Sequence, residues 1–93
     1  MAARQKKRLE WSRRSAQDLL DIDAYIAVDN QSAADEVIGH LRERALLLEI
    51  DPLLGKQRVA SPHRELVLTR YPYTIIYRIR GRVALNGHFG WKI

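Results

Sequence analysis

The sequence predicts an α+β domain in which an N-terminal helical hairpin packs on one face of a small antiparallel sheet. Two patterns indicate this. In the first half of the chain, apolar residues recur at spacings of three and four, as in amphipathic helices. After residue 62 they alternate with polar residues, as in half-buried strands. The predicted order is β-α-α-β-β-β, and the length favours a single domain, 1–93.

The helical hairpin is predicted from two apolar stripes and the residues that can cap them. A strand candidate at 6–11 leads to Ser12, which can cap the first helix. Ser32 and Asp35 offer a capping box for the second helix, which Pro52 ends. Two such helices joined by a few residues pack antiparallel. The stripes are Ala16, Leu19, Ile22 and Ile26 in the first helix, and Ala34, Ile38, Leu41, Ala45 and Leu48 in the second.

The second half of the chain is expected to supply the rest of the sheet. Residues 51–62 are predicted to be a loop with Gly55 at its turn. Short connections between the strands that follow predict an antiparallel meander. These strands are expected at 64–71, 73–80 and 82–89.

The composition excludes several kinds of site. The chain has no cysteine, so disulfides, thiolate metal sites and a cysteine nucleophile are ruled out. The histidines are scattered and there is no glycine-rich phosphate loop, so we expect no metal and no cofactor. No apolar run approaches the roughly 20 residues of a membrane span, and the first residues do not resemble a secretory signal. A cytoplasmic location is therefore expected.

The charge distribution favours an anionic partner. Sixteen Lys and Arg against eleven Asp and Glu give a net charge of +5. The acidic residues are concentrated between positions 17 and 51, and beyond Asp51 only Glu65 remains. The C-terminal half is thus almost purely cationic, which suits nucleic acid or an acidic protein surface.

Several short motifs resemble toxins of the RelE/ParE family of type II toxin–antitoxin systems. They are 9–12 (LEWS), 51–55 (DPLLG), 64–66 (REL) and, most strongly, 71–79 (YPYTIIYRI), and they occur in the family's order. The resemblance implies a toxin that a cognate antitoxin neutralises in a hetero-oligomer. It also implies one of two targets: DNA gyrase, which ParE-type members bind, or messenger RNA, which RelE-type members cut on the ribosome.

Two features favour the ParE type. The Trp11-Ser12 opening and the Tyr-Pro-Tyr corner at 71–73 are closer to it. Relatives usually carry a histidine, an arginine and an aromatic residue near the C-terminus, whereas here His88 is followed by 89–93 without an arginine. This departure weakens the case for an enzyme. The alternatives to gyrase inhibition are a metal-independent endoribonuclease and a nontoxic basic module that binds nucleic acid.

The candidate site residues follow from charge, chemistry and position. Cationic residues expected to meet at one end of the sheet are assigned to the target, namely Lys56, Arg58, Arg64 and Arg78. If the protein is a nuclease, phosphate stabilisation and proton transfer favour Arg64, Arg78 and His88, with His63 and Tyr77 as further proton-transfer candidates. The antitoxin, which is commonly acidic in this family, is expected to contact the hairpin through Leu20, Tyr25 and Val28.

Overall fold

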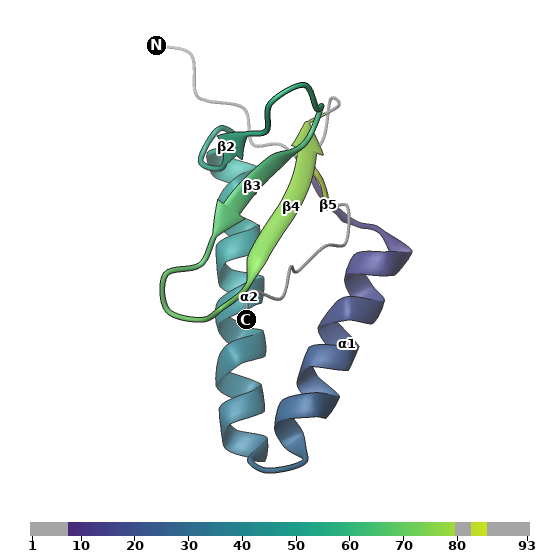
Figure 1. The fold of residues 1–93 in the computed structure, drawn as a ribbon, viewed down its shortest axis with the longest axis vertical. Coiled ribbons are helices and arrows are strands. Elements are labelled where there is room, and N and C mark those ends of the chain that lie inside the picture. Colours follow the sequence, from purple (N-terminus) through teal and green to yellow (C-terminus); the bar gives the residue numbers. More distant parts are fainter. Residues whose placement is uncertain (1–7, 80–82, 86–93) are drawn as a thin grey trace.

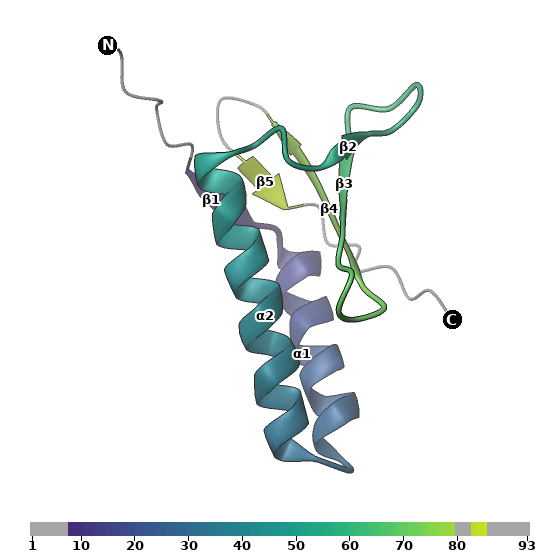
Figure 2. The same ribbon diagram turned by 90° about the vertical axis from the view of Figure 1, so that its left-hand side faces the viewer.

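A computed structural model describes residues 8–79 and 83–85 and confirms the predicted α+β fold (Figures 1 and 2). A two-residue strand lies inside the segment that was predicted to be a loop. The elements in chain order are β1 (Leu9–Trp11), α1 (Arg13–Ala27), α2 (Gln31–Ile50), β2 (Lys56–Gln57), β3 (Arg64–Val67), β4 (Thr74–Ile79) and β5 (Val83–Leu85).

The five strands form one sheet in the order β1-β5-β4-β3-β2. Strands β3, β4 and β5 make the predicted antiparallel meander, and β2 extends it. Strand β1 instead pairs in parallel with β5. A parallel pair needs a long connection. Here the chain between β1 and β5 forms the helical hairpin and the strands β2, β3 and β4. The sequence patterns had not indicated this pairing.

Each helix begins at a residue whose side chain caps its first turn. Ser12 Oγ accepts a hydrogen bond from Ser15 N at 3.0 Å, as the capping prediction required. The second helix starts earlier than predicted: its cap is Asn30, whose Oδ1 accepts from Ala33 N at 3.0 Å. Asn30 has an extended backbone, whereas Ser32 already lies within the helix and cannot take the capping position.

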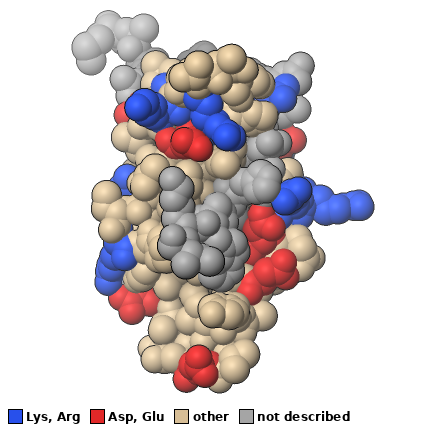
Figure 3. Space-filling view, viewed as in Figure 1, with Lys and Arg blue, Asp and Glu red and all other residues tan. Residues whose placement is uncertain are grey.

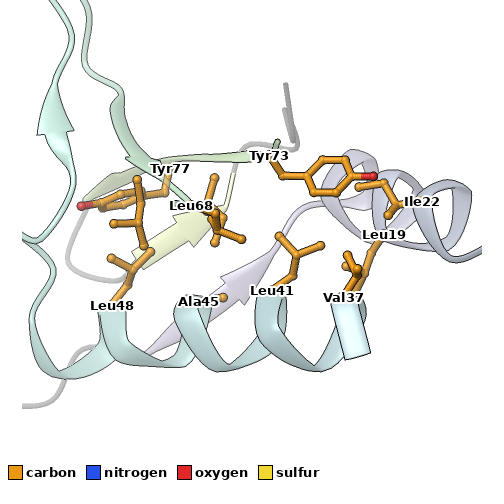
Figure 4. Close-up of a cluster of buried hydrophobic side chains, with 11 residues drawn as sticks. Leu19, Ile22, Val37, Leu41, Ala45, Leu48, Leu68, Tyr73 and Tyr77 are labelled. Carbon is orange, nitrogen blue, oxygen red and sulfur yellow. The ribbon is translucent and has the colours of Figure 1, made fainter. Parts of the chain in front are cut away.

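The core lies between α2 and the sheet, and α1 closes one side of it (Figure 4). Tyr77 stands over Leu48 at one end, and Tyr73 reaches toward Leu19 and Ile22 of α1 at the other. The buried cluster consists of Leu19, Ile22, Val37, Leu41, Ala45, Leu48, Leu66, Leu68, Tyr73, Ile75 and Tyr77. The alternating patterns of β3 and β4 therefore predicted the buried face correctly.

The stripe predicted for α1 is only partly buried. Leu19 and Ile22 face the core, but Ala16 is exposed and Ile26 is half-buried. Ser15 is buried instead, because its hydroxyl donates to Ser12 O at 2.8 Å and is therefore satisfied inside the protein. The far half of the hairpin also extends beyond the sheet, which leaves much of α1 uncovered (Figures 1 and 2).

The loop after α2 is fixed by the hydroxyl group of Tyr77. This oxygen accepts a hydrogen bond from Gly55 N at 2.8 Å and donates one to Pro52 O at 2.7 Å. A Cβ atom at Gly55 would lie 2.6 Å from Tyr77 Oη and 2.9 Å from Glu65 O. The loop can therefore approach β3 and β4 this closely only because residue 55 is glycine.

Replacing Gly55 by alanine is expected to lower the free energy of unfolding by roughly 1–3 kcal/mol, because the methyl group would overlap Tyr77 and the backbone of β3. Gly39→Ala in α2 is the matched control, since its Cβ would meet nothing within 4 Å. That variant should gain up to about 1 kcal/mol from helix propensity. Urea denaturation measures both changes, and equal stability of the two variants would contradict the packing described for the loop.

Candidate functional site

The cationic residues predicted to meet at one end of the sheet lie on two different faces of it. Successive side chains of a strand point to opposite faces. Arg64 shares its face of β3 with the buried Leu66, and its cross-strand partner is the buried Tyr77. Lys56 in β2 and Arg78 in β4 occupy the alternate positions of their strands, so their side chains point to the face away from the helices. The pleat of the sheet thus separates Arg64 from the others.

On the helix-facing side, Arg64 holds the same loop as the Tyr77 hydroxyl. Its Nε donates to Gly55 O at 3.0 Å, and its other nitrogens donate to Gln57 Oε1 at 3.0 Å and Leu53 O at 3.3 Å. The guanidinium group has a fixed fork of donors, which suits such a set of oxygens. In this structure Arg64 therefore stabilises the loop, and its contact with a target stays a prediction.

On the outer face, the remaining cationic residues gather over β2, β3 and β4. Lys56 pairs with Glu65 in the β2–β3 register, and Arg58 Nε lies 3.5 Å from Glu65 Oε1. Arg58 N donates to His63 O at 3.0 Å, and the β3–β4 register extended by one residue sets His63 beside Arg78. We call Lys56, Arg58 and Arg78 the cationic cluster, and His63 lies beside it.

The charges of the cationic cluster are only partly neutralised. Figure 3 shows Lys and Arg side chains at the β2–β3 end of the molecule, with acidic side chains directly beside them. The Arg58–Glu65 pair is partly exposed and is worth about 1 kcal/mol at most. Within residues 8–79 and 83–85, the side chains of Lys56 and Arg78 make no hydrogen bond or ion pair. Their charges are therefore available to an anionic partner.

The residues named for a nuclease are not assembled into one site in the described ranges. Arg64 and Arg78 lie on opposite faces of the sheet, and His88 lies outside the described residues. The Tyr77 hydroxyl is buried and bonded to two backbone groups. His63 is half-buried, with Nδ1 3.2 Å from Ser61 Oγ.

The residues predicted to contact the antitoxin are all exposed. Leu20, Tyr25 and Val28 show 63%, 67% and 83% of their surfaces, so Leu20 does not complete the core. Tyr25 stands near Tyr73 of the sheet: burial raises the pKa of Tyr73 above its ordinary value, and the Tyr25 phenol adds to that shift. Leu20 and Tyr25 lie on α1, and Val28 directly follows its last residue.

Sequence reasoning missed a groove that runs along the hairpin. It has a volume of about 830 Å³ and is lined by residues of β1, α1 and α2. Ile38 was assigned to the buried stripe but is half-buried at the groove, and Leu46 is 53% exposed there. The available signal was Leu46, an apolar residue outside the stripe of α2. Its lining includes Leu20, Asp23, Ile38, Gly39, Arg42 and Leu46.

No group of three or more His, Asp or Glu side chains within the described residues could hold a metal ion. No helix in the same ranges is long and apolar enough to cross a membrane.

The described residues form a small α+β domain with cationic side chains on the outer face of the sheet and exposed apolar side chains on α1. The chain belongs to the family described as ParE toxin of type II toxin-antitoxin system, parDE, whose model matches residues 9–85. It is 33% identical over 90 residues to "Putative toxin Y4kP" of Sinorhizobium fredii (strain NBRC 101917 / NGR234), covering 92% of this chain and 94% of that one. These matches confirm the predicted family and the closer relation to ParE.

A solved structure has the same fold. It is titled "Chromosomal ParDE TA system from P. aeruginosa" and superposes with a TM-score of 0.80. The identity is 21%, and the match covers 95% of this chain and 99% of that one. The helical hairpin on its sheet is therefore an architecture also found in that system.

Arg64 and Arg78 are expected to respond differently to replacement by alanine. Arg64→Ala removes two hydrogen bonds to the loop and one to Gln57 of β2, and thermal or urea unfolding should show a loss of about 1–2 kcal/mol. Arg78→Ala, the matched control, should stay within about 0.5 kcal/mol of the wild type. An Arg64→Ala variant as stable as the wild type would contradict its structural role.

Proposed function

We propose that this protein inhibits DNA gyrase by binding it, and that a cognate antitoxin neutralises it by covering the helical hairpin. Membership of the ParE toxin family carries the proposal. The family belongs to two-component toxin–antitoxin systems, so we expect a partner protein and a hetero-oligomer formed with it. Both interactions would take place in the cytoplasm, where gyrase acts.

The cationic cluster is the surface we assign to the target. Lys56 and Arg78 have no partner within the described ranges, and Arg58 has only a weak one. Such a surface steers association with an acidic protein region and sets its orientation. Arg64 would contribute indirectly, because it holds the loop that leads into β2.

The apolar hairpin surface is the one we assign to the antitoxin. Leu20, Tyr25 and Val28 are large apolar or aromatic residues with more than half of their surface exposed. Apolar side chains left in water gain free energy when a partner covers them, and these three lie on one helix and the turn after it. A separate antitoxin surface also means that variants can distinguish the two interactions.

One observation favours the alternative, cleavage of messenger RNA on the ribosome. His63 lies between Arg58 and Arg78 on the outer face of the sheet. Histidine transfers protons near neutral pH, and arginines stabilise phosphate charge. The test must therefore measure both activities.

Purified protein should be titrated into a gyrase supercoiling assay on relaxed plasmid, alongside a ribosome-programmed RNA cleavage assay. We expect supercoiling to be inhibited and the RNA to stay intact. Arg78→Glu should raise the concentration for half-inhibition by roughly tenfold or more, the equivalent of about 1.4 kcal/mol in binding. Arg14→Glu changes the net charge equally at an exposed site on α1 and should leave inhibition unchanged.

Other outcomes would redirect the assignment. Cut RNA with normal supercoiling would make the protein a ribonuclease, and His63, Arg78 and His88 would become the residues to replace first. If neither activity is found, salt-sensitive binding to nucleic acid without growth arrest would identify a basic nucleic-acid-binding module.

A further inference from the structure

We propose that the loop between β2 and β3 anchors the protein to its target through Val59, which enters an apolar pocket bordered by carboxylates on the target protein. This inference rests on the proposed function. It adds the residue that enters the target and the chemistry of the site that receives it.

Val59 lies in a loop that projects beyond the sheet and away from both helices (Figure 2). It is 96% exposed, the largest exposed fraction of any large apolar residue in the described ranges. At this exposure the fold gains almost no burial from the side chain. A partner that covers Val59 removes its apolar surface from water, which favours association.

The loop is held in one shape by its own hydrogen bonds. Arg58 N donates to His63 O at 3.0 Å, which closes the loop at its base. Within the loop, Gln57 Nε2 donates to Ser61 O at 2.6 Å, and His63 N donates to Ser61 Oγ at 3.1 Å. A loop that is already ordered loses little conformational entropy when it binds. These bonds therefore prepare the loop for docking.

The backbone next to Val59 is strained. Ala60 has a φ of 52°, in the left-handed region that residues other than glycine rarely adopt. Such a conformation persists only where the surrounding contacts impose it, and it is found most often at binding and catalytic sites. Alanine also restricts the backbone more than glycine would at this position. Val59 is thus presented from a constrained turn.

The charges near Val59 restrict the class of partner. Lys56 and Arg58 precede it in the chain, and the carboxylate of Glu65 lies 3.5 Å from Arg58 Nε. An apolar side chain beside two cations complements an apolar pocket with carboxylates at its border. Nucleic acid is also anionic, but proteins bind it through charges, hydrogen bonds and stacked aromatic rings. A valine side chain offers none of these, so a protein surface is favoured.

The experiment is the gyrase supercoiling assay with variants of Val59. Val59→Ala removes two methyl groups and no charge, so the concentration for half-inhibition should rise roughly tenfold. Val59→Lys brings an ammonium group to the apolar pocket and should raise that concentration about tenfold or more. A target held by electrostatic attraction alone would instead bind Val59→Ala equally well and Val59→Lys more tightly.

Ile50→Lys is the matched control for charge. Ile50 is the last residue of α2 and is 55% exposed, so this variant adds the same charge at another exposed apolar position. Its half-inhibition should stay within about twofold of the wild type. All three variants should melt at the temperature of the wild type. Calorimetric titration with the antitoxin encoded beside the toxin should give affinities within about twofold of the wild type.

The results separate this inference from the proposed function. Unchanged inhibition in Val59→Ala and Val59→Lys would overturn the role of the loop and leave gyrase as the target. If the wild type leaves supercoiling unaffected, the proposed target is wrong, and growth arrest on expression tests the loop. Arrest lost in both Val59 variants would support an apolar pocket on another protein, whereas arrest kept in both would overturn the inference.

Two further outcomes would also overturn it. Faster RNA cleavage by Val59→Lys than by the wild type would identify nucleic acid as the surface that the loop meets. Antitoxin affinity weakened about tenfold in Val59→Ala, with gyrase inhibition unchanged, would assign the loop to the antitoxin instead.

Discussion

The arrangement of the loop after α2 and of the strand β2 that follows it depends on the Tyr77 hydroxyl, which is hydrogen-bonded to Pro52 O and Gly55 N. It joins the end of α2 to β4, which lies in the middle of the sheet. Arg64 reinforces this contact from β3. Because the loop leads directly into β2, its position also determines where β2 presents its side chains. A change that destabilises the loop should therefore also displace the side chains that β2 presents on the outer face.

The two faces of the sheet carry different kinds of side chain. The face toward the helices holds the buried tyrosines and leucines together with Arg64, and it stabilises the fold. The outer face carries Lys56 and Arg58, which are exposed, and Arg78, which is half-buried. On the hairpin, a similar division separates the buried stripe of α2 from the groove. The domain therefore presents cationic side chains on the outer face of the sheet and an open groove on the hairpin.

The fold was predictable because burial follows the period of each element. The alternation in β4 identified Tyr73, Ile75 and Tyr77 as one face, and the stripe of α2 identified its buried side. The pairing of β1 with β5 was not predictable, because a parallel contact between chain ends depends on tertiary packing. The cap at Asn30 was missed for a local reason: several adjacent polar residues can cap, and backbone conformation selects among them.

The site was less predictable than the fold. The sequence identified the exposed Leu20, Tyr25 and Val28 and the cationic residues of the second half, but composition cannot tell which face of a sheet an arginine occupies. From the sequence, Arg64 is expected to be an unpaired cation available to a target. In the structure its guanidinium group donates hydrogen bonds to three oxygens. The groove at Gly39 depends on the distance between two helices, which no local pattern encodes.

The most direct test of this account is a double-mutant cycle of Tyr77→Phe and Arg64→Ala, followed by urea denaturation. Tyr77→Phe removes one oxygen and leaves a buried donor and acceptor unpaired, so a loss of about 1–3 kcal/mol is expected. Because both side chains hold one loop, the double variant should lose less than the sum of the single losses, by at least about 0.5 kcal/mol. Additive losses, or a Tyr77→Phe variant as stable as the wild type, would contradict the claim that the two residues fix the loop together.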